Sequence, residues 1–133
     1  MCPLPSRFAR TLGIASLLCL LPLAGCGRTG GRDLSLDADQ ARQSFNTFLE
    51  TWKQGKTAGD LKALEPSIIA GDEDWAAGAK LVSYKVAPQE FNDGANLHLT
   101  AELQLNGKNA KKSGKAAVSY VVGTSPVITI FRK

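Results

Sequence analysis

The residues of this sequence whose types suit catalysis or metal binding are few, and their spacing does not suit such chemistry. His98 is the only histidine, and a catalytic triad or a zinc site needs partners at fixed positions around it. The alternation of the surrounding segment places His98 on the polar face of a strand, so we expect an exposed side chain.

Three consecutive acids lack the alternating spacing and internal glycine of a calcium loop. We expect no metal site and no cofactor, and we interpret these acids as favourable charges in the first turn of a helix: Asp72, Glu73 and Asp74.

Two tyrosines, Tyr84 and Tyr120, alternate with valines in segments that read as strands. A tyrosine beside a carboxylate base can act as an oxyanion-hole donor. No Asp or Glu lies within the predicted strands 80–87, 115–123 and 127–132, so we expect no acid–base pair on their inner face. Both tyrosines are therefore interpreted as core residues, and no catalytic residue is predicted.

The first 25 residues have the successive parts of a secretory signal. Arg7 and Arg10 give a basic start, and residues 12–23 are almost wholly apolar. This apolar run is shorter than the roughly 20 residues that a membrane-spanning helix needs. The segment is therefore predicted to direct export and then to be removed.

The end of this segment, Leu23-Ala24-Gly25-Cys26, resembles the lipobox of bacterial lipoproteins at all four positions. The resemblance implies cleavage between Gly25 and Cys26, and acylation of both the Cys26 thiol and the new amine. Each buried CH₂ contributes about 0.8 kcal/mol, so two or three acyl chains would anchor the protein firmly. We expect an exported protein held in the cell envelope by membrane lipid, and the glycine at position 27, where an aspartate retains lipoproteins at the inner membrane, favours the outer membrane.

This processing would also change the composition of the mature chain. Cys2 and Cys19 would leave with the signal, and acylation of Cys26 would leave neither a free thiol nor a disulfide. The chain has 16 basic and 12 acidic residues, a net charge of +4, and the loss of Arg7 and Arg10 lowers it to +2. The sequence has no dense basic stripe with interleaved aromatic residues, so a nucleic-acid partner is not expected.

The mature chain is predicted to have a short tether and one domain. Residues 26–33 are rich in glycine and arginine, typical of a flexible tether, and residues 34–133 suffice for one core. Apolar residues recur at steps of three and four from Ala38 to Trp52. This spacing predicts a long helix with Asp37 as its N-cap.

The rest of the domain is predicted to change from helix to strand. A shorter helix follows the Thr57 capping box and ends at Pro66, and Ile68-Ile69 forms a short extended piece. After Gly78 the apolar residues alternate, and strands are predicted at 80–87, 95–105, 115–123 and 127–132. This order predicts an α+β fold in which the long N-terminal helix packs on a curved four-stranded antiparallel meander sheet.

Three segments together resemble small lipoproteins that have a truncated, cystatin-like version of the NTF2-like α+β fold. The resemblance spans nearly all of residues 34–133 and brings no catalytic signature. It implies the helix-on-sheet fold, and it favours a homodimer, because dimerisation through the sheet is common among such domains. The segments are FNTFLETWKQG at 45–55, DEDWAAGAKLVSY at 72–84 and YVVGTSPVITIFR at 120–132.

The last two predicted strands are apolar on both faces, whereas one helix can cover only one face. Val121, Val127 and Phe131 on the second face are therefore candidate interface residues. We expect a membrane-anchored, non-catalytic binding or protein-interaction module that forms a homodimer through the sheet or binds another envelope protein.

Two other functions remain open at the level of the sequence. The alternative is a carrier of a small apolar ligand, with a pocket between helix and sheet. A degenerate NTF2-like enzyme is the third interpretation, and it requires a polar group that points into a cavity. The residues that would line the pocket, or else form the core, are Phe45, Phe48, Trp52, Tyr84 and Tyr120.

Overall fold

The computed structural model describes residues 35–107 and 114–133. The predictions for the signal, the tether, cleavage after Gly25 and lipidation of Cys26 therefore lie outside the described residues. The described elements are α1 (Ala38–Lys53), α2 (Ala58–Lys62), β1 (Ile68–Gly71), α3 (Glu73–Ala76), β2 (Lys80–Asn92), β3 (Asn96–Asn106), β4 (Gly114–Gly123) and β5 (Ile128–Arg132).

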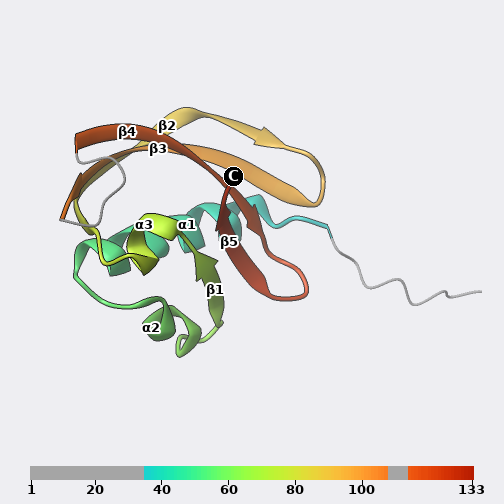
Figure 1. Ribbon diagram of the computed structural model, residues 1–133. Coiled ribbons are helices and arrows are strands. Elements are labelled where there is room, and N and C mark those ends of the chain that lie inside the picture. The colour runs from blue at the N-terminus through green and yellow to red at the C-terminus, as the bar shows by residue number, and fades with distance from the viewer. Residues whose placement is uncertain (1–34, 108–113) are drawn as a thin grey trace, which may run out of the picture.

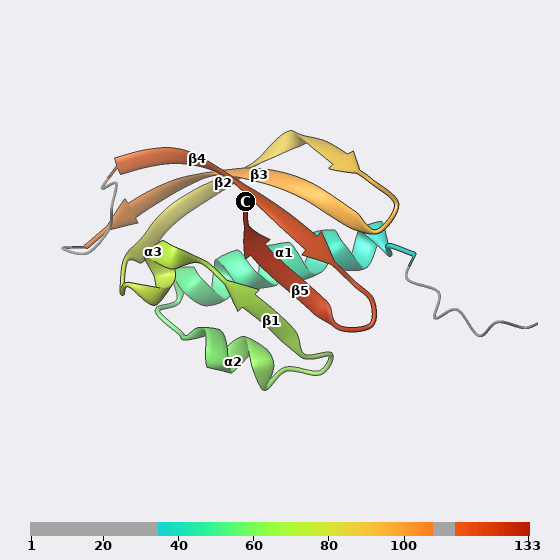
Figure 2. The ribbon, with the colours of Figure 1, turned by 45° about the vertical axis from the view of Figure 1, so that its right-hand side comes forward.

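The fold is α+β, with three helices and one mixed sheet of five strands among the described residues. The strand order is β1-β5-β4-β3-β2, and only the β1–β5 pair is parallel. Figures 1 and 2 show the sheet curving around α1, which packs against its inner face, while α2 lies beside β1. The inner face of the sheet and one side of α1 therefore enclose the core.

Helix α1 forms where its sequence predicts it. The side chain of Asp37 accepts a hydrogen bond from the backbone N–H of Gln40 and so caps the first turn. The apolar stripe of the helix faces the sheet, and at its end the indole of Trp52 donates a 2.8 Å hydrogen bond to the carbonyl of Ala79. The buried residues of the helix are Ala41, Ser44, Phe45, Phe48, Leu49 and Trp52.

The prediction of a four-stranded meander is wrong because a fifth strand, β1, pairs with β5. The extended piece at Ile68-Ile69 continues to Gly71 and lies parallel to β5, with Ile68 opposite Ile128. Its partner is far along the chain, and four residues are too few to show a period. The local pattern therefore could not show that this segment joins the sheet.

Strand β2 also differs from its prediction, because Pro88 does not end it. The strand runs to Asn92, with a shift in register between Val86 and Glu90. It is an edge strand, where a bulge and a residue without an N–H are tolerated. Beyond the bulge, Glu90 accepts a hydrogen bond from Arg42, which fastens the end of β2 to α1.

Candidate functional site

The face of the sheet that α1 does not cover, here called the outer face, carries several exposed apolar side chains. Side chains alternate along each strand, so the residues between the buried inner positions point outward. Phe131, Val127 and Ile69 are 46%, 41% and 38% exposed, and Val121 lies half-buried opposite Phe131. We call these four residues, on or beside β1, β4 and β5, the apolar patch.

The apolar patch contains all three residues that the sequence predicted as an interface, together with Ile69 from the unpredicted strand. Gly71 lies opposite Phe131 in the β1–β5 pair. A Cβ atom on Gly71 would lie only 2.9 Å from Cδ1 of Phe131. The phenyl ring of Phe131 therefore packs directly against the backbone of Gly71. Because Gly71 has no side chain, the ring can lie over the edge of the sheet.

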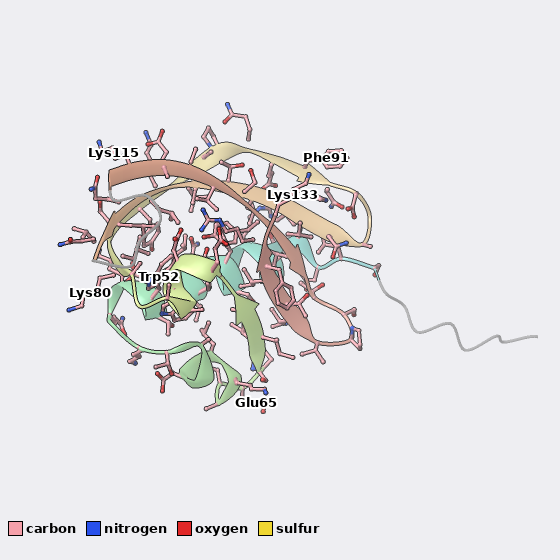
Figure 3. The ribbon with its side chains drawn as sticks, viewed as in Figure 1. Trp52, Glu65, Lys80, Phe91, Lys115 and Lys133 are labelled. Carbon is pink, nitrogen blue, oxygen red and sulfur yellow. The ribbon has the colours of Figure 1, made fainter. Side chains whose placement is uncertain are left out.

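A second feature of the outer face is a shallow hollow of about 230 Å³ over β2, β3 and β4. Phe91 is 64% exposed at its rim, and its ring lies 5.5 Å from that of His98. Figure 3 shows Phe91 and Lys133 toward one end of the sheet, with Lys80 and Lys115 toward the other. We call this region the outer hollow; its lining residues are Gln89, Glu90, Phe91, His98, Leu99, Thr100, Ser119 and Lys133.

His98 is only partly exposed, contrary to the sequence-based expectation of an exposed side chain, and it has a partner. Its Nε2 atom lies 2.7 Å from Oδ2 of Asp93, and its side chain is 24% exposed. The other carboxylate oxygen of Asp93 accepts hydrogen bonds from the backbone N–H groups of Ala95 and Asn96. The hydrogen bond with His98, followed by these backbone bonds, lowers the pKa of Asp93 to about 2. The pair fastens the β2–β3 turn beside the outer hollow.

The inner face of the sheet carries a buried polar network that the sequence did not predict. The hydroxyl of Tyr120 donates a 2.7 Å hydrogen bond to Oδ2 of Asp72. The guanidinium of Arg132 hydrogen-bonds to Asp74 and lies 3.6 Å from Asp72. The three acids lie at the start of a helix as predicted, but the side chains of Asp72 and Asp74 are buried there, with 0% and 3% exposed.

The acids of this network come from the start of α3 and not from a strand, so the composition of the predicted strands gave no sign of them. Asp72 is also the N-cap of α3, at the start of the helical turn that the sequence predicted, because its Oδ1 accepts from the N–H groups of Asp74 and Trp75. The expectation that no carboxylate faces the inner tyrosine is therefore wrong for Tyr120. The signal available in the sequence was the single arginine, Arg132, in an otherwise apolar strand.

Electrostatics favour the protonated forms of Tyr120 and Arg132 in this network. Burial, followed by the hydrogen bond to Asp72, raises the pKa of Tyr120 far above its ordinary value. Burial by itself lowers the pKa of Arg132, but the hydrogen bond to Asp74 and both nearby carboxylates raise it above its usual value. The phenol thus stays protonated and the guanidinium charged. Both oxygens of Asp72 are already hydrogen-bonded within the protein. The network therefore has a structural role and holds α3 against β4 and β5.

The five residues predicted as pocket or core do not share one environment. Four of them are buried in the core: Phe45, Phe48, Trp52 and Tyr120. Their rings fill the space between α1 and the sheet, with successive centroids 5.3–6.1 Å apart. Such packing is typical of a protein interior.

Tyr84, the fifth of these residues, lies at the margin of the core. Its hydroxyl donates a 2.6 Å hydrogen bond to Glu50 of α1, and the ammonium of Lys53 lies 6.0 Å from its ring. Partial burial, followed by the hydrogen bond to Glu50, raises the pKa of Tyr84 to about 12. Tyr84 therefore fastens β2 to α1 at a position that solvent reaches.

Within residues 35–107 and 114–133, no three His, Cys, Asp or Glu side chains are grouped so that they could hold a metal ion. No helix in the same ranges is long and apolar enough to cross a membrane.

Comparisons of the chain with protein-family models, curated proteins and solved structures find no match. The function is therefore inferred from the residues and their geometry.

Proposed function

We propose that this protein is a non-catalytic, lipid-anchored interaction module of the cell envelope that associates with a second copy of itself through the apolar patch. The exposure of Phe131, Val127 and Ile69 on one face carries this proposal. Contiguous apolar side chains that remain in contact with water commonly mark a surface that binds another protein. Every member of the apolar patch is uncharged, so two such patches can meet without charge repulsion.

The lipid anchor supports self-association by concentrating the protein. Cys26, in the lipobox-like sequence, would hold each copy at a membrane surface. Two copies on one membrane meet at a much higher effective concentration than in solution. An apolar patch of four residues is smaller than the interface of a stable soluble dimer, so we expect association to be weak without the membrane.

The geometry of the domain suits an approach of two copies on the same membrane. The N–H of Leu36 donates to the carbonyl of Gly94, and the N–H of Asp37 donates to the hydroxyl of Thr124. The start of α1 therefore lies at the end of the sheet that carries the β2–β3 and β4–β5 turns. Copies tethered from this end would stand in the same orientation and could meet through their outer faces.

A distant relationship to truncated NTF2-like, cystatin-like domains is part of the same proposal. The long helix α1 against the inner face of a curved sheet supports it. The parallel pairing of β1 with β5 adds a strand to the four-stranded meander that this resemblance implied. We also propose the outer membrane as the location, on the sequence argument from position 27.

The self-association is tested with single-cysteine variants of the full chain. If Cys26 is acylated and the signal is removed, the mature protein has no other thiol. A short bis-maleimide crosslinker should then join copies of Val127→Cys in membranes, and the additional change Phe131→Ser should reduce the yield. The matched control is Asn46→Cys, an exposed position on α1, which should not crosslink. Equal yields at both positions, or no effect of Phe131→Ser, would contradict self-association through the apolar patch.

The anchor is tested separately. Cells grown with labelled palmitate should label the wild-type protein, and the variant Cys26→Ala should lose both the label and the association with membranes. Retention of both in Cys26→Ala would show that another segment holds the protein at the membrane.

A further inference from the structure

Two neighbouring rows of side chains, each running across the strands, line the outer hollow. One row is aromatic and the other is polar. Phe91 lies opposite His98, and their rings are in contact. One level further along β3 and β4, Thr100 lies opposite Ser119, and their hydroxyl groups are 3.1 Å apart. The N–H of Lys133 donates to the carbonyl of Ser119, so the last residue extends the polar row beyond β4. A ligand in the outer hollow would contact both rows at once.

The polar row is suited to a ligand with many hydroxyl groups. The two hydroxyls of Thr100 and Ser119 share one hydrogen bond, which leaves one further O–H and several lone pairs for a ligand. The side-chain amide of Gln89 likewise offers both donors and acceptors. These three groups are uncharged, and Lys133 supplies a cation at one end. Such groups match hydroxyl and acetamido substituents, which both donate and accept hydrogen bonds.

The aromatic row is suited to the flat, apolar face of a sugar ring. The ring of Phe91 is 64% exposed, so it offers a face on which a pyranose can stack. An amphipathic helix that packed its apolar side on Phe91 would bring the charged residues of its polar side next to the polar row. Three of the groups in the polar row, on Gln89, Thr100 and Ser119, are neutral and only Lys133 is a cation, so most charges on a helix would find no partner there, and this favours a sugar over a helix.

The length of the polar row indicates more than one sugar. It crosses from Gln89 on β2 to Lys133 beyond β5, a distance of three strand spacings, or about 14 Å at about 4.8 Å for each spacing. This length exceeds a single pyranose ring. We propose that the outer hollow is a binding site for an oligosaccharide, with one sugar stacked on Phe91 and the next hydrogen-bonded to Thr100 and Ser119. The proposal goes beyond self-association and does not depend on it, because Phe131 does not line the outer hollow.

The test is isothermal titration calorimetry of the full chain in detergent micelles with the tetramer of N-acetylglucosamine, and with the tetramer of glucose as a second probe. A titration into empty micelles serves as the blank. We expect at least one tetramer to bind the wild type. Phe91→Ala should weaken the affinity about tenfold, because the stacking face is lost. Thr100→Val, which keeps the shape of the side chain, should weaken it about fivefold.

The controls separate a binding role from a structural one. Val82, on the same strand, is 52% exposed and lies outside the outer hollow, so Val82→Ala should bind as the wild type does. Phe91→Tyr keeps an aromatic face and should restore the affinity. Circular dichroism should show unchanged folding for each variant, because Phe91 is exposed and does not contribute to the core.

The possible results are distinct. No binding of either tetramer, or equal binding by the wild type and Phe91→Ala, would overturn the oligosaccharide site. Binding that Phe131→Ser abolishes would also overturn it, because the site would then be the apolar patch. Binding unchanged in Phe131→Ser, together with reduced crosslinking when this change is added to Val127→Cys, would support two separate surfaces.

Discussion

The hydroxyl of Tyr120, on β4, lies 2.7 Å from Oδ2 of Asp72, the residue that begins α3. The second oxygen of the same carboxylate caps α3 through the N–H groups of Asp74 and Trp75. One buried side chain thus starts a helix and fastens it to the middle of the sheet. Because both oxygens of Asp72 are engaged, this network contributes to the stability of the fold and leaves the outer face free for binding.

Removal of the Tyr120 hydroxyl should destabilise the protein measurably. In Tyr120→Phe the buried Oδ2 of Asp72 loses its donor, and an unsatisfied buried acceptor costs about 1–3 kcal/mol. Urea unfolding should therefore show a lower free energy of unfolding by about this amount. The matched control is Tyr84→Phe, where the hydroxyl contacts the exposed Glu50 and water can replace it. If both variants show the same small decrease in the free energy of unfolding, the hydrogen bond to Asp72 does not stabilise the fold.

The positive charge of Arg132 should matter more than its size. Arg132→Met keeps most of the side-chain volume but removes the guanidinium that lies beside the buried carboxylates of Asp72 and Asp74. Loss of one partner from a buried ion pair typically costs about 3–5 kcal/mol. The additional change Asp74→Asn removes one of the two carboxylates that faced the guanidinium and should recover part of the loss in chemical unfolding. A double variant less stable than Arg132→Met would contradict this account.

The β2–β3 turn should weaken in acid. Asp93 has a pKa of about 2 in the folded protein, lowered from 3.8 mainly by its hydrogen bond with His98. A carboxylate whose pKa is lowered by folding contributes stability above its ordinary pKa, and this stability is lost as the pH falls through the folded value. Exchange of the Ala95 and Asn96 amide protons, normalised for the intrinsic rate, should therefore rise between about pH 4 and pH 2. Asp93→Asn cannot titrate, and the same rise in this variant would show that another group is responsible.

A side chain at position 71 should displace the ring of Phe131. A Cβ atom there would lie 2.9 Å from Cδ1 of Phe131, so Gly71→Val should destabilise the protein by about 1–3 kcal/mol through overpacking. The double variant Gly71→Val, Phe131→Ala makes room for the new side chain and should be more stable than the sum of the two single effects predicts. Thermal unfolding of the four proteins measures this coupling. Strict additivity would show that the two side chains do not compete for the same space.

Elements with a complete local signal were predicted well. Helix α1 has a cap at Asp37 and an apolar stripe of four turns, and both appear in the structure. The alternation of β3 is equally clear, and its inner residues from Leu97 to Leu105 are buried as predicted. In these segments the period of the apolar residues and the required burial agree, so no distant contact is needed to decide the structure.

Elements that depend on distant partners were not predicted. Strand β1 exists because Ile68 to Gly71 pair with residues 128–131, and Phe91 was missed because β2 passes through its bulge instead of ending at Pro88. In both cases hydrogen bonds to a neighbouring strand override the local signal. Tyr84 was predicted in the core but lies at its margin, where its hydroxyl donates to Glu50 of α1.

The sequence by itself determined the α+β class, the position of α1, and the expectation of an exported chain with a lipid anchor at Cys26. These properties follow from residues that are adjacent or regularly spaced. Only the tertiary structure brought Asp72 and Asp74 to Tyr120 and Arg132, and aligned Phe91 with His98 on the outer face. The physical reason is that charge pairs and binding surfaces depend on distances in space, and the pairing of strands sets those distances between residues up to about half the chain apart.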